Sequence, residues 1–228
     1  MATMRFKFKR GETLRLISHL DQQRLFQRAF RRAEIPMAYS SGFNPHPKLA
    51  FSGAMALGLT SDAEYGDIGL SEEIEPKAFI KEINAVLPMG IAITEAWIIR
   101  PGTPSLSASL SNARYHITFY GVENEKSDAL YQESIARFMD QETILIEKRN
   151  KKGRTQEVDI RPFIQSLSYT GKQGDTLGFD LAVVYIDQKC VKPLLVMTAL
   201  NDFAKLELTV DATVGLHKSM QQLLDDDF

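Results

Sequence analysis

Patterns of hydrophobic and polar residues divide the first hundred residues into strands and helices. Arg5-Phe6-Lys7-Phe8-Lys9 alternates with a period of two, which is typical of a half-buried strand. Ser18 and Asp21 have the spacing of a capping box and predict the start of a helix that ends before Pro36. The apolar side of this helix is expected to consist of Leu25, Phe26, Ala29, Phe30 and Ala33. Further strands are expected at 49–55, 65–70 and 91–99, with a helix that starts at Pro76.

The remaining residues show a similar succession of elements. Strands are expected at 115–120, 143–148, 156–160, 177–186 and 208–214, and helices at 128–139 and 194–206. In the first of these helices, Leu130, Ile135 and Phe138 are expected to face the core. Residues 101–113 are rich in Pro, Gly and Ser, which indicates a linker. The whole pattern predicts an α+β protein of two tandem ferredoxin-like (βαββαβ) sandwiches with antiparallel sheets, residues 1–100 and 114–228.

Composition excludes several kinds of chemistry. Cys190 is the single cysteine in 228 residues, so disulfides and cysteine-ligated zinc or iron–sulfur sites formed by this chain alone are excluded. The four histidines, His19, His46, His116 and His217, are dispersed, and no nucleotide-hydrolase or serine-hydrolase motif occurs, so we expect no metal and no cofactor. The sequence has no long apolar run and no signal peptide, which favours a cytoplasmic protein without membrane contact.

Positive charge is concentrated near the start of the chain. Residues 1–50 hold ten Lys or Arg and three acidic residues, whereas residues 51–100 hold three basic and eight acidic ones. Arg24, Arg28, Arg31 and Arg32 lie on the outer side of the first predicted helix, with no acid between residues 22 and 33. Like charges at this spacing destabilise a helix, which favours an anionic partner such as phosphate. Alternatively, the arginine stems cover the edge of the core and pair with acids from residues 62–75.

A second basic cluster lies in a predicted turn between two strands. Its basic residues are Lys148, Arg149, Lys151, Lys152 and Arg154, and Gly153 supplies the conformational freedom that the turn needs. A hairpin of this kind suits a nucleic-acid backbone, although a solubilising loop tip would have the same composition. Two basic clusters together favour nucleic acid. The aromatic residues near the first cluster, candidates for base stacking or for the core, are Phe6, Phe8, Tyr39 and Phe43.

The loop at residues 40–48 is the third candidate for function. Its polar residues, which we expect to meet a substrate or a partner, are Ser40, Ser41, Asn44, His46 and Lys48. Pro45 and Pro47 restrict the backbone on both sides of His46, so its imidazole is a candidate acid or base together with Lys48 or His19. The alternative is a rigid structural turn in which His46 bonds to the backbone. His19, in the first turn of the helix, is expected to be structural.

Several segments resemble one bacterial family. They are residues 16–21, 24–33, 38–48, 57–58 and 64–67, and the basic turn that runs into Val158-Asp159-Ile160-Arg161-Pro162. The chain resembles the radical-SAM-linked family, classed as a domain of unknown function, over most of its length. The resemblance implies a radical SAM protein of the cobalamin-binding type as partner. This chain lacks the three-cysteine cluster motif, so the resemblance implies an accessory role.

Together, these observations lead to one hypothesis and two alternatives. The chain is predicted to be an RNA-binding accessory protein that works with a radical SAM enzyme in the modification or maturation of a structured RNA. Under the first alternative it is a protein-interaction or ligand-binding module that docks the radical SAM partner without nucleic acid. Under the second it is a metal-independent RNA-processing enzyme that uses His46.

Overall fold

The chain forms two compact units in the computed structural model, which describes residues 2–123, 126–149, 153 and 155–224. The first unit comprises the described residues of Met1–Leu110 and Leu223–Phe228, and the second comprises those of Ser111–Gln222. Both are mixed α+β structures, and their sheets are largely antiparallel. Among the described residues, no helix has the length and apolar character needed to cross a membrane.

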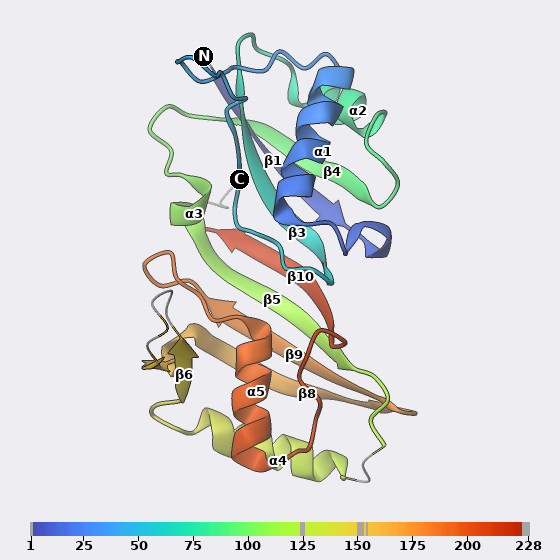
Figure 1. The fold of residues 1–228 in the computed structure, drawn as a ribbon, viewed down its shortest axis with the longest axis vertical. Helices are drawn as coiled ribbons and strands as arrows, with labels where there is room; N and C mark the ends of the chain where they lie inside the picture. Colours follow the sequence, from blue (N-terminus) through green and yellow to red (C-terminus); the bar gives the residue numbers. More distant parts are fainter. Residues whose placement is uncertain (1, 124–125, 150–152, 154, 225–228) are drawn as a thin grey trace. The chain divides into compact units, whose positions relative to one another are not determined.

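The first unit is a sheet covered by two helices on one face (Figure 1). Its elements are β1 (Ala2–Arg10), η1 (Glu12–Leu14), α1 (His19–Arg32), β2 (Leu49–Phe51), β3 (Leu59–Leu70), α2 (Pro76–Asn84), β4 (Ile91–Ile99) and α3 (Leu106–Ser109). β1 pairs with both β4 and β3, and β2 pairs with β3, all in antiparallel register. The strand order is therefore β4-β1-β3-β2.

A cluster of phenylalanine rings forms the core of this unit. Phe6 and Phe8 project from β1 to the helix side of the sheet, where Phe26 and Phe30 of α1 and Phe79 of α2 meet them. All five side chains are almost completely buried. The alternating pattern of β1 and the helical spacing of α1 thus predicted this core correctly. Consequently, α1 is held by its apolar side and its opposite side faces solvent.

Two predictions for the first unit need correction. The strand expected at 49–55 ends at Phe51, because the chain then turns and the Arg10 guanidinium donates to the carbonyl of Ala56 at 3.0 Å. The strand expected at 65–70 begins earlier, at Leu59. In addition, the segment predicted as a linker contains the short helix α3, and the next strand starts directly after it at Leu110.

The second unit combines a four-stranded sheet, two helices and a separate hairpin. Its elements are β5 (Leu110–Phe119), α4 (Asp128–Met139), β6 (Leu145–Arg149), β7 (Thr155–Asp159), η2 (Arg161–Phe163), β8 (Ile164–Gln173), β9 (Thr176–Val184), α5 (Pro193–Ala204) and β10 (Gly215–Leu223). The strand order of the main sheet is β10-β5-β9-β8. β6 and β7 form their own two-stranded sheet, inserted in the chain between α4 and β8.

The expected helix at 128–139 is confirmed, but one of its three inward residues is not. Ile135 and Phe138 are buried, whereas Leu130 is 39% exposed. Tyr131 takes the inward position instead, and its ring stacks on Tyr169 of β8 at 4.9 Å between centroids. α4 is therefore rotated slightly about its own axis relative to the predicted orientation. Tyr131 faces the core in place of Leu130, because its larger ring fills more of the core.

Two strands of the second unit differ from the prediction. β8 was not predicted, because it is an edge strand in which only Ile164 and Leu167 are buried, so its hydrophobic pattern is weak. The last strand was expected at 208–214 but runs from Gly215 to Leu223. Asp211 ends any extended structure before it, since its carboxylate accepts from the backbone N–H of Thr213 at 2.8 Å and forms a turn.

Candidate nucleic-acid interface

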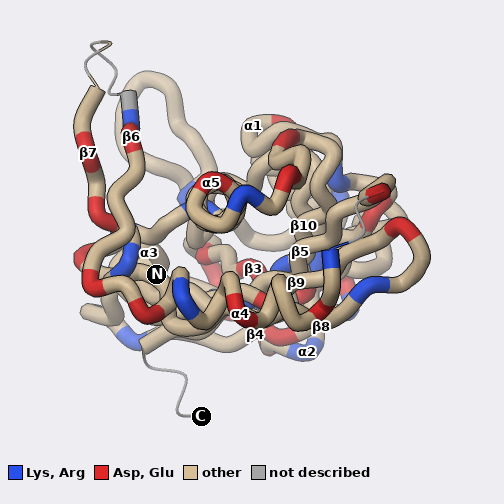
Figure 2. Tube along the Cα trace, turned by 90° about the horizontal axis from the view of Figure 1, so that it is seen from below, with Lys and Arg blue, Asp and Glu red and all other residues tan. Residues whose placement is uncertain are grey.

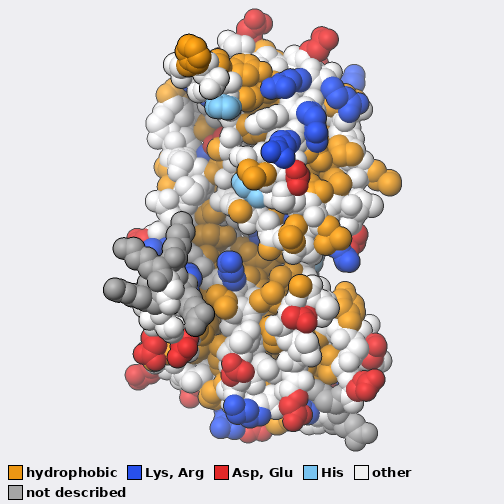
Figure 3. Space-filling view, viewed as in Figure 1, with side chains coloured by type: hydrophobic (Ala, Val, Ile, Leu, Met, Phe, Trp, Pro, Cys, Tyr) orange, Lys and Arg blue, Asp and Glu red, His pale blue; other side chains and the backbone are white. Residues whose placement is uncertain are grey.

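The solvent side of α1 carries a row of arginines, Arg24, Arg28, Arg31 and Arg32, here called the arginine face. All four side chains are exposed, and Figure 3 shows basic side chains gathered over α1. The helix that presents them is fixed at its start by Ser18, whose Oγ accepts from the backbone N–H of Asp21 at 3.1 Å. The same hydroxyl donates to the carboxylate and, as the main cause, holds the pKa of Asp21 below its ordinary value.

Few acidic side chains pair with the arginine face. Arg24 lies 3.5 Å from Asp21 in an exposed i,i+3 pair, which stabilises little. Arg28, Arg31 and Arg32 form no ion pair within the described part of the chain. The alternative interpretation, in which these arginines pair with acids from residues 62–75, is therefore wrong for Arg28, Arg31 and Arg32. Asp67 from that region pairs instead with Arg5, through two hydrogen bonds of 2.8 and 2.9 Å.

Two arginines that contribute to the positive charge of the first fifty residues are internal. Arg5 is 3% exposed and paired as above. Arg10 is 1% exposed and donates to the Gln22 side chain at 3.0 Å and to the carbonyls of Ala56 and Leu59 at 3.0 and 2.8 Å. Burial lowers the pKa of Arg10, and the nearby charge of Glu64 partly opposes this shift. Neither side chain is available to an external anion, so surface charge is concentrated on α1 more than the sequence suggests.

The loop at residues 40–48 is closed at its neck and open at its tip. The backbone N–H of Ser40 donates to the carbonyl of His46 at 2.8 Å, and the N–H of His46 donates to Ser40 Oγ at 3.0 Å. At the base, the N–H of Lys48 donates to the carbonyl of Ala38 at 2.9 Å. Between these bonds Gly42 has a φ of 127°, and the Phe43 side chain is fully exposed. The loop thus presents an aromatic ring on a fixed base.

The three candidate acid–base residues are not assembled into a catalytic group. His46 is exposed, and its described bonds involve only its backbone. The ring of His19 packs against Phe51 at 6.1 Å between centroids, and its buried Nδ1 has no hydrogen bond. Lys48 is exposed beside the neck of the loop. In the described residues no hydrogen bond joins the imidazoles of His46 and His19, and none orients the His46 ring.

The basic hairpin is described only in part. Glu147 on β6 and Glu157 on β7 are directly opposite each other, and Figure 2 shows acidic positions along both strands. Lys148 is exposed on β6. Arg149 ends β6, but its side chain is not described, and Lys151, Lys152 and Arg154 lie outside the described residues. The strands on both sides of the predicted turn are confirmed, and the role of its basic residues stays a prediction.

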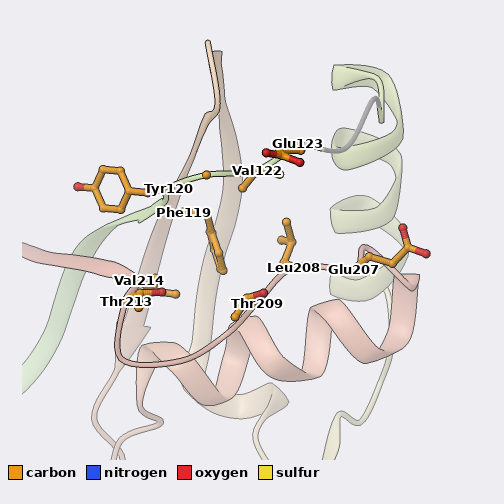
Figure 4. A pocket seen from close by; sticks show the side chains of 10 residues that line it. Phe119, Tyr120, Val122, Glu123, Glu207, Leu208, Thr209, Thr213 and Val214 are labelled. Atoms are coloured by element: carbon orange, nitrogen blue, oxygen red, sulfur yellow. The ribbon is translucent and has the colours of Figure 1, made fainter.

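The second unit contains a cavity that no sequence motif indicated. Its volume is about 100 Å³, and its lining consists of Phe119, Tyr120, Gly121, Val122, Glu123, Glu207, Leu208, Thr209, Thr213 and Val214. Figure 4 shows Phe119 and Leu208 pointing into it and Tyr120 pointing away. The Glu207 carboxylate is held at the rim by Lys126 Nζ at 2.6 Å, a hydrogen bond that lowers its pKa. The cavity has room for a few water molecules only.

One pair of histidines lies together although the sequence separates them by a hundred residues. The rings of His116 and His217 are parallel within 8°, with centroids 6.2 Å apart. No spacing motif indicates this pair, because it arises from the pairing of β5 with β10, strands from opposite ends of the second unit. In the part of the chain that is described, no group of three or more His, Cys, Asp or Glu side chains is suited to a metal ion.

Comparison with known proteins places the chain in a family. Residues 3–193 match the family described as "Uncharacterized protein conserved in bacteria (DUF2344)", so the chain belongs to this family. The resemblance to a bacterial family of that kind is thereby confirmed, and its link to radical SAM proteins stays a prediction. No curated protein matches the sequence.

Two solved structures show a distant likeness. One is a chain of a Cbf5-Nop10-Gar1 complex, with 9% identity, a TM-score of 0.45 and 96% of this chain covered. The other is a chain of an H/ACA RNP bound to a substrate RNA containing 2'-deoxyuridine, with 10% identity, a TM-score of 0.41 and again 96% of this chain covered. The alignments cover 48% and 47% of those chains, so this chain spans about half their length. A likeness of this degree does not transfer function.

Proposed function

We propose that this chain is an RNA-binding accessory protein that presents a structured RNA, transfer or ribosomal, to a radical SAM enzyme. One observation carries the RNA-binding part: Arg28, Arg31 and Arg32 are exposed on one helix and unpaired among the described residues. Guanidinium groups match phosphate oxygens in bidentate geometry, and a row of them follows a phosphate backbone. The proposed binding residues also include Arg24 and the hairpin cations Lys148, Arg149, Lys151, Lys152 and Arg154.

The 40–48 loop, which follows the C-terminal end of α1, supports the same proposal. The helix ends at Arg32, and only five residues separate it from Ala38 at the base of the loop. The exposed ring of Phe43 is suited to stack on an unpaired base, while Ser41, Asn44 and His46 supply hydrogen-bonding groups close by in sequence. Phosphate contacts from α1 and base contacts from the loop would together recognise an RNA with a single-stranded region.

The radical SAM partner is proposed from the sequence resemblance and from the chemistry of the one cysteine. Burial is the main reason that the pKa of the Cys190 thiol is raised to about 11, so the thiol stays protonated at neutral pH and is a poor metal ligand. A chain with this single cysteine supplies no set of thiolates for an iron–sulfur cluster. The radical chemistry would therefore belong to the partner, and this chain would hold the substrate.

A salt series with a charge-reversed variant tests the RNA-binding proposal. Fluorescence anisotropy with transfer RNA and ribosomal RNA fragments is expected to show an affinity that falls linearly with salt on logarithmic axes. In the double variant Arg28→Glu, Arg31→Glu the slope should become shallower by about 0.7–0.9 for each lost phosphate contact. Lys77→Glu, Lys81→Glu on α2 is the matched control, because it changes the net charge equally on another helix of the same unit.

The two variants must differ for the proposal to stand. If both lower the affinity equally, binding depends on net charge and not on the arginine face. If the natural protein binds no RNA even at low salt, the nucleic-acid function is wrong.

The loop makes a separate prediction. Phe43→Ala is expected to leave the stability of the protein within about 0.5 kcal/mol, because the fully exposed ring contacts no other ring among the described residues and is not part of the core. The same change should weaken RNA binding about five- to tenfold through the loss of one stacked base. Urea unfolding and anisotropy measure the two effects. Equal RNA affinity in the natural protein and in Phe43→Ala would remove the loop from the interface.

Protein docking without nucleic acid is the second candidate, and one observation favours it. Leu16, Leu20 and Leu57 are 71%, 60% and 64% exposed near the start of α1. A hydrogen bond of 2.8 Å from Gly58 N–H to the Arg15 carbonyl brings the chain at Leu16 close to that at Leu57. Exposed leucines of this kind are typical of protein contacts. If RNA does not bind, this apolar region becomes the first place to look for the partner enzyme.

We also propose that each unit is a ferredoxin-like sandwich. The strand order β4-β1-β3-β2 of the first unit, with its helices on one face, supports this assignment. If the β6–β7 hairpin is counted as an insertion, the order β10-β5-β9-β8 of the second unit is the same: in both units the last strand is followed across the sheet by the first, the third and the second. The proposed boundary between the units lies at the end of α3, near Leu110.

A further inference from the structure

The second unit has a polar sheet face that the proposed function does not use. Along β5, Tyr115, Ile117 and Phe119 point to the helix side, where Phe119 contacts the ring of Phe179. The residues between them point to the opposite side, here called the polar sheet face. Its members on the four strands are Arg114, His116 and Thr118 of β5, Asp180 of β9, Ser166 and Ser168 of β8, and His217 and Ser219 of β10.

One row across this face contains two imidazole rings. His116 is directly opposite Asp180 on β9, and its ring lies parallel to that of His217 on β10. The His116 Nδ1 donates to Asp180 Oδ1, which fixes the ring orientation and leaves Nε2 without a hydrogen bond to the described residues. The side chain of His116 is 55% exposed, so its ring is accessible as well as oriented.

A third ring and an arginine extend the row. Tyr120 is 65% exposed, and an ideal Cβ on Gly215 would lie 2.9 Å from its hydroxyl, so the phenol ring lies over a position without a side chain. Arg114 is exposed two residues from His116 on the same side of β5. Its guanidinium has no hydrogen bond or ion pair within the described residues.

We infer that the polar sheet face binds unpaired nucleobases of a single-stranded RNA segment, a step that deepens the proposed function and rests on it. Exposed aromatic rings on the face of a sheet give stacking surfaces that every base fits. Arg114 provides a cation for the phosphates that follow the bases. The Asp180 carboxylate repels phosphate, but it is engaged by His116, so the phosphates are expected on the Arg114 side of the row.

The four histidines allow one experiment to test both surfaces. His19 and His46 belong to the first unit and report on α1 and the loop, whereas His116 and His217 report on the polar sheet face. We would follow the imidazole ring signals of the full chain by NMR while adding a ten-nucleotide oligouridine. The signals of His116 and His217 are expected to shift, and to shift as well in the Arg28→Glu, Arg31→Glu variant.

The possible outcomes separate this inference from the proposed function. A shift of the His46 signal with His116 and His217 unmoved overturns the inference and supports RNA binding on the first unit. A shift of His116 and His217 in both the natural protein and the arginine variant supports the inference. If neither oligouridine nor structured RNA moves any of the four signals, the inference and the proposed function both fail.

Affinity measurements provide a second readout that does not depend on assigning signals. The double variant His116→Ala, His217→Ala should weaken oligouridine binding about tenfold. Gln165→Ala is the matched control, because it removes an exposed polar side chain of β8 without removing a ring or a charge. Thermal unfolding of both variants shows whether the sheet is intact. Equal affinities in a folded histidine variant and in the control would overturn the inference.

Discussion

Replacing Phe26 with alanine is expected to lower the free energy of unfolding of the first unit by about 3–5 kcal/mol. The side chain is completely buried, and its ring lies 5.0–5.8 Å from those of Phe6, Phe8 and Phe30. No neighbour can fill the cavity, because the surrounding rings are rigid. Since Phe26 also attaches α1 to the sheet, the arginine face should lose its fixed position together with the core.

The single tryptophan makes this measurement specific to one unit. Trp97 lies on β4 in the first unit, so urea unfolding followed by its fluorescence reports on that unit. Phe203→Ala is the control, since Phe203 lies on α5 of the second unit and is 40% exposed. We expect the control to leave the Trp97 transition within about 0.5 kcal/mol. A transition that does not move in Phe26→Ala would contradict the described core.

Arg10→Ala should destabilise the first unit by a similar amount, about 3–5 kcal/mol. The change leaves the Gln22 side chain, the buried carbonyl of Leu59 and the partly buried carbonyl of Ala56 without the donor that they now have, and it removes the cation near Glu64. A buried acceptor without a donor costs more than the bond itself contributes. The same Trp97 transition measures the loss.

Two further variants separate the causes of this loss. Arg10→Met keeps most of the apolar stem, so a loss close to that of Arg10→Ala assigns the effect to the hydrogen bonds and the charge. Lys9→Ala, the exposed neighbour on β1, should change the stability by no more than about 0.5 kcal/mol. If Arg10→Ala lowers the free energy of unfolding by less than about 1 kcal/mol, the guanidinium does not hold the segment around Ala56 in place.

Local patterns predicted the first unit better than the second. The alternation in β1, the capping box at Ser18 and the proline at the start of α2 each act within a few residues, and the structure has the expected element at each place. In contrast, β8 is recognised only through its pairing with β9, because its outward residues are polar. The turn at Asp211 similarly overrides a segment whose β-branched residues favour a strand.

The candidate sites likewise show that sequence patterns predict features formed within a few residues and miss those formed by distant contacts. Exposure of the arginine face follows from helical spacing and was predicted, but the burial of Arg10 was not, because it depends on acceptors that lie up to 49 residues away. The His116–His217 pair could not be found by spacing either. Its two members come from strands at opposite ends of the unit, which become neighbours only in the finished sheet.

The β6–β7 hairpin has a consequence for how this fold tolerates change. Within the described residues its strands pair only with each other, and its base is closed by the hydrogen bond of 2.8 Å from Ile160 N–H to the Ile144 carbonyl, two residues that are buried. Asp159 belongs to this base, because its carboxylate accepts from the backbone N–H groups of Ile144 and Arg161, whereas the β6–β7 ladder beyond it adds no strand to the main sheet. Replacing this ladder with a two-residue turn would yield a minimal scaffold, and lengthening it offers a place to graft a fluorophore or an affinity tag without disturbing either core.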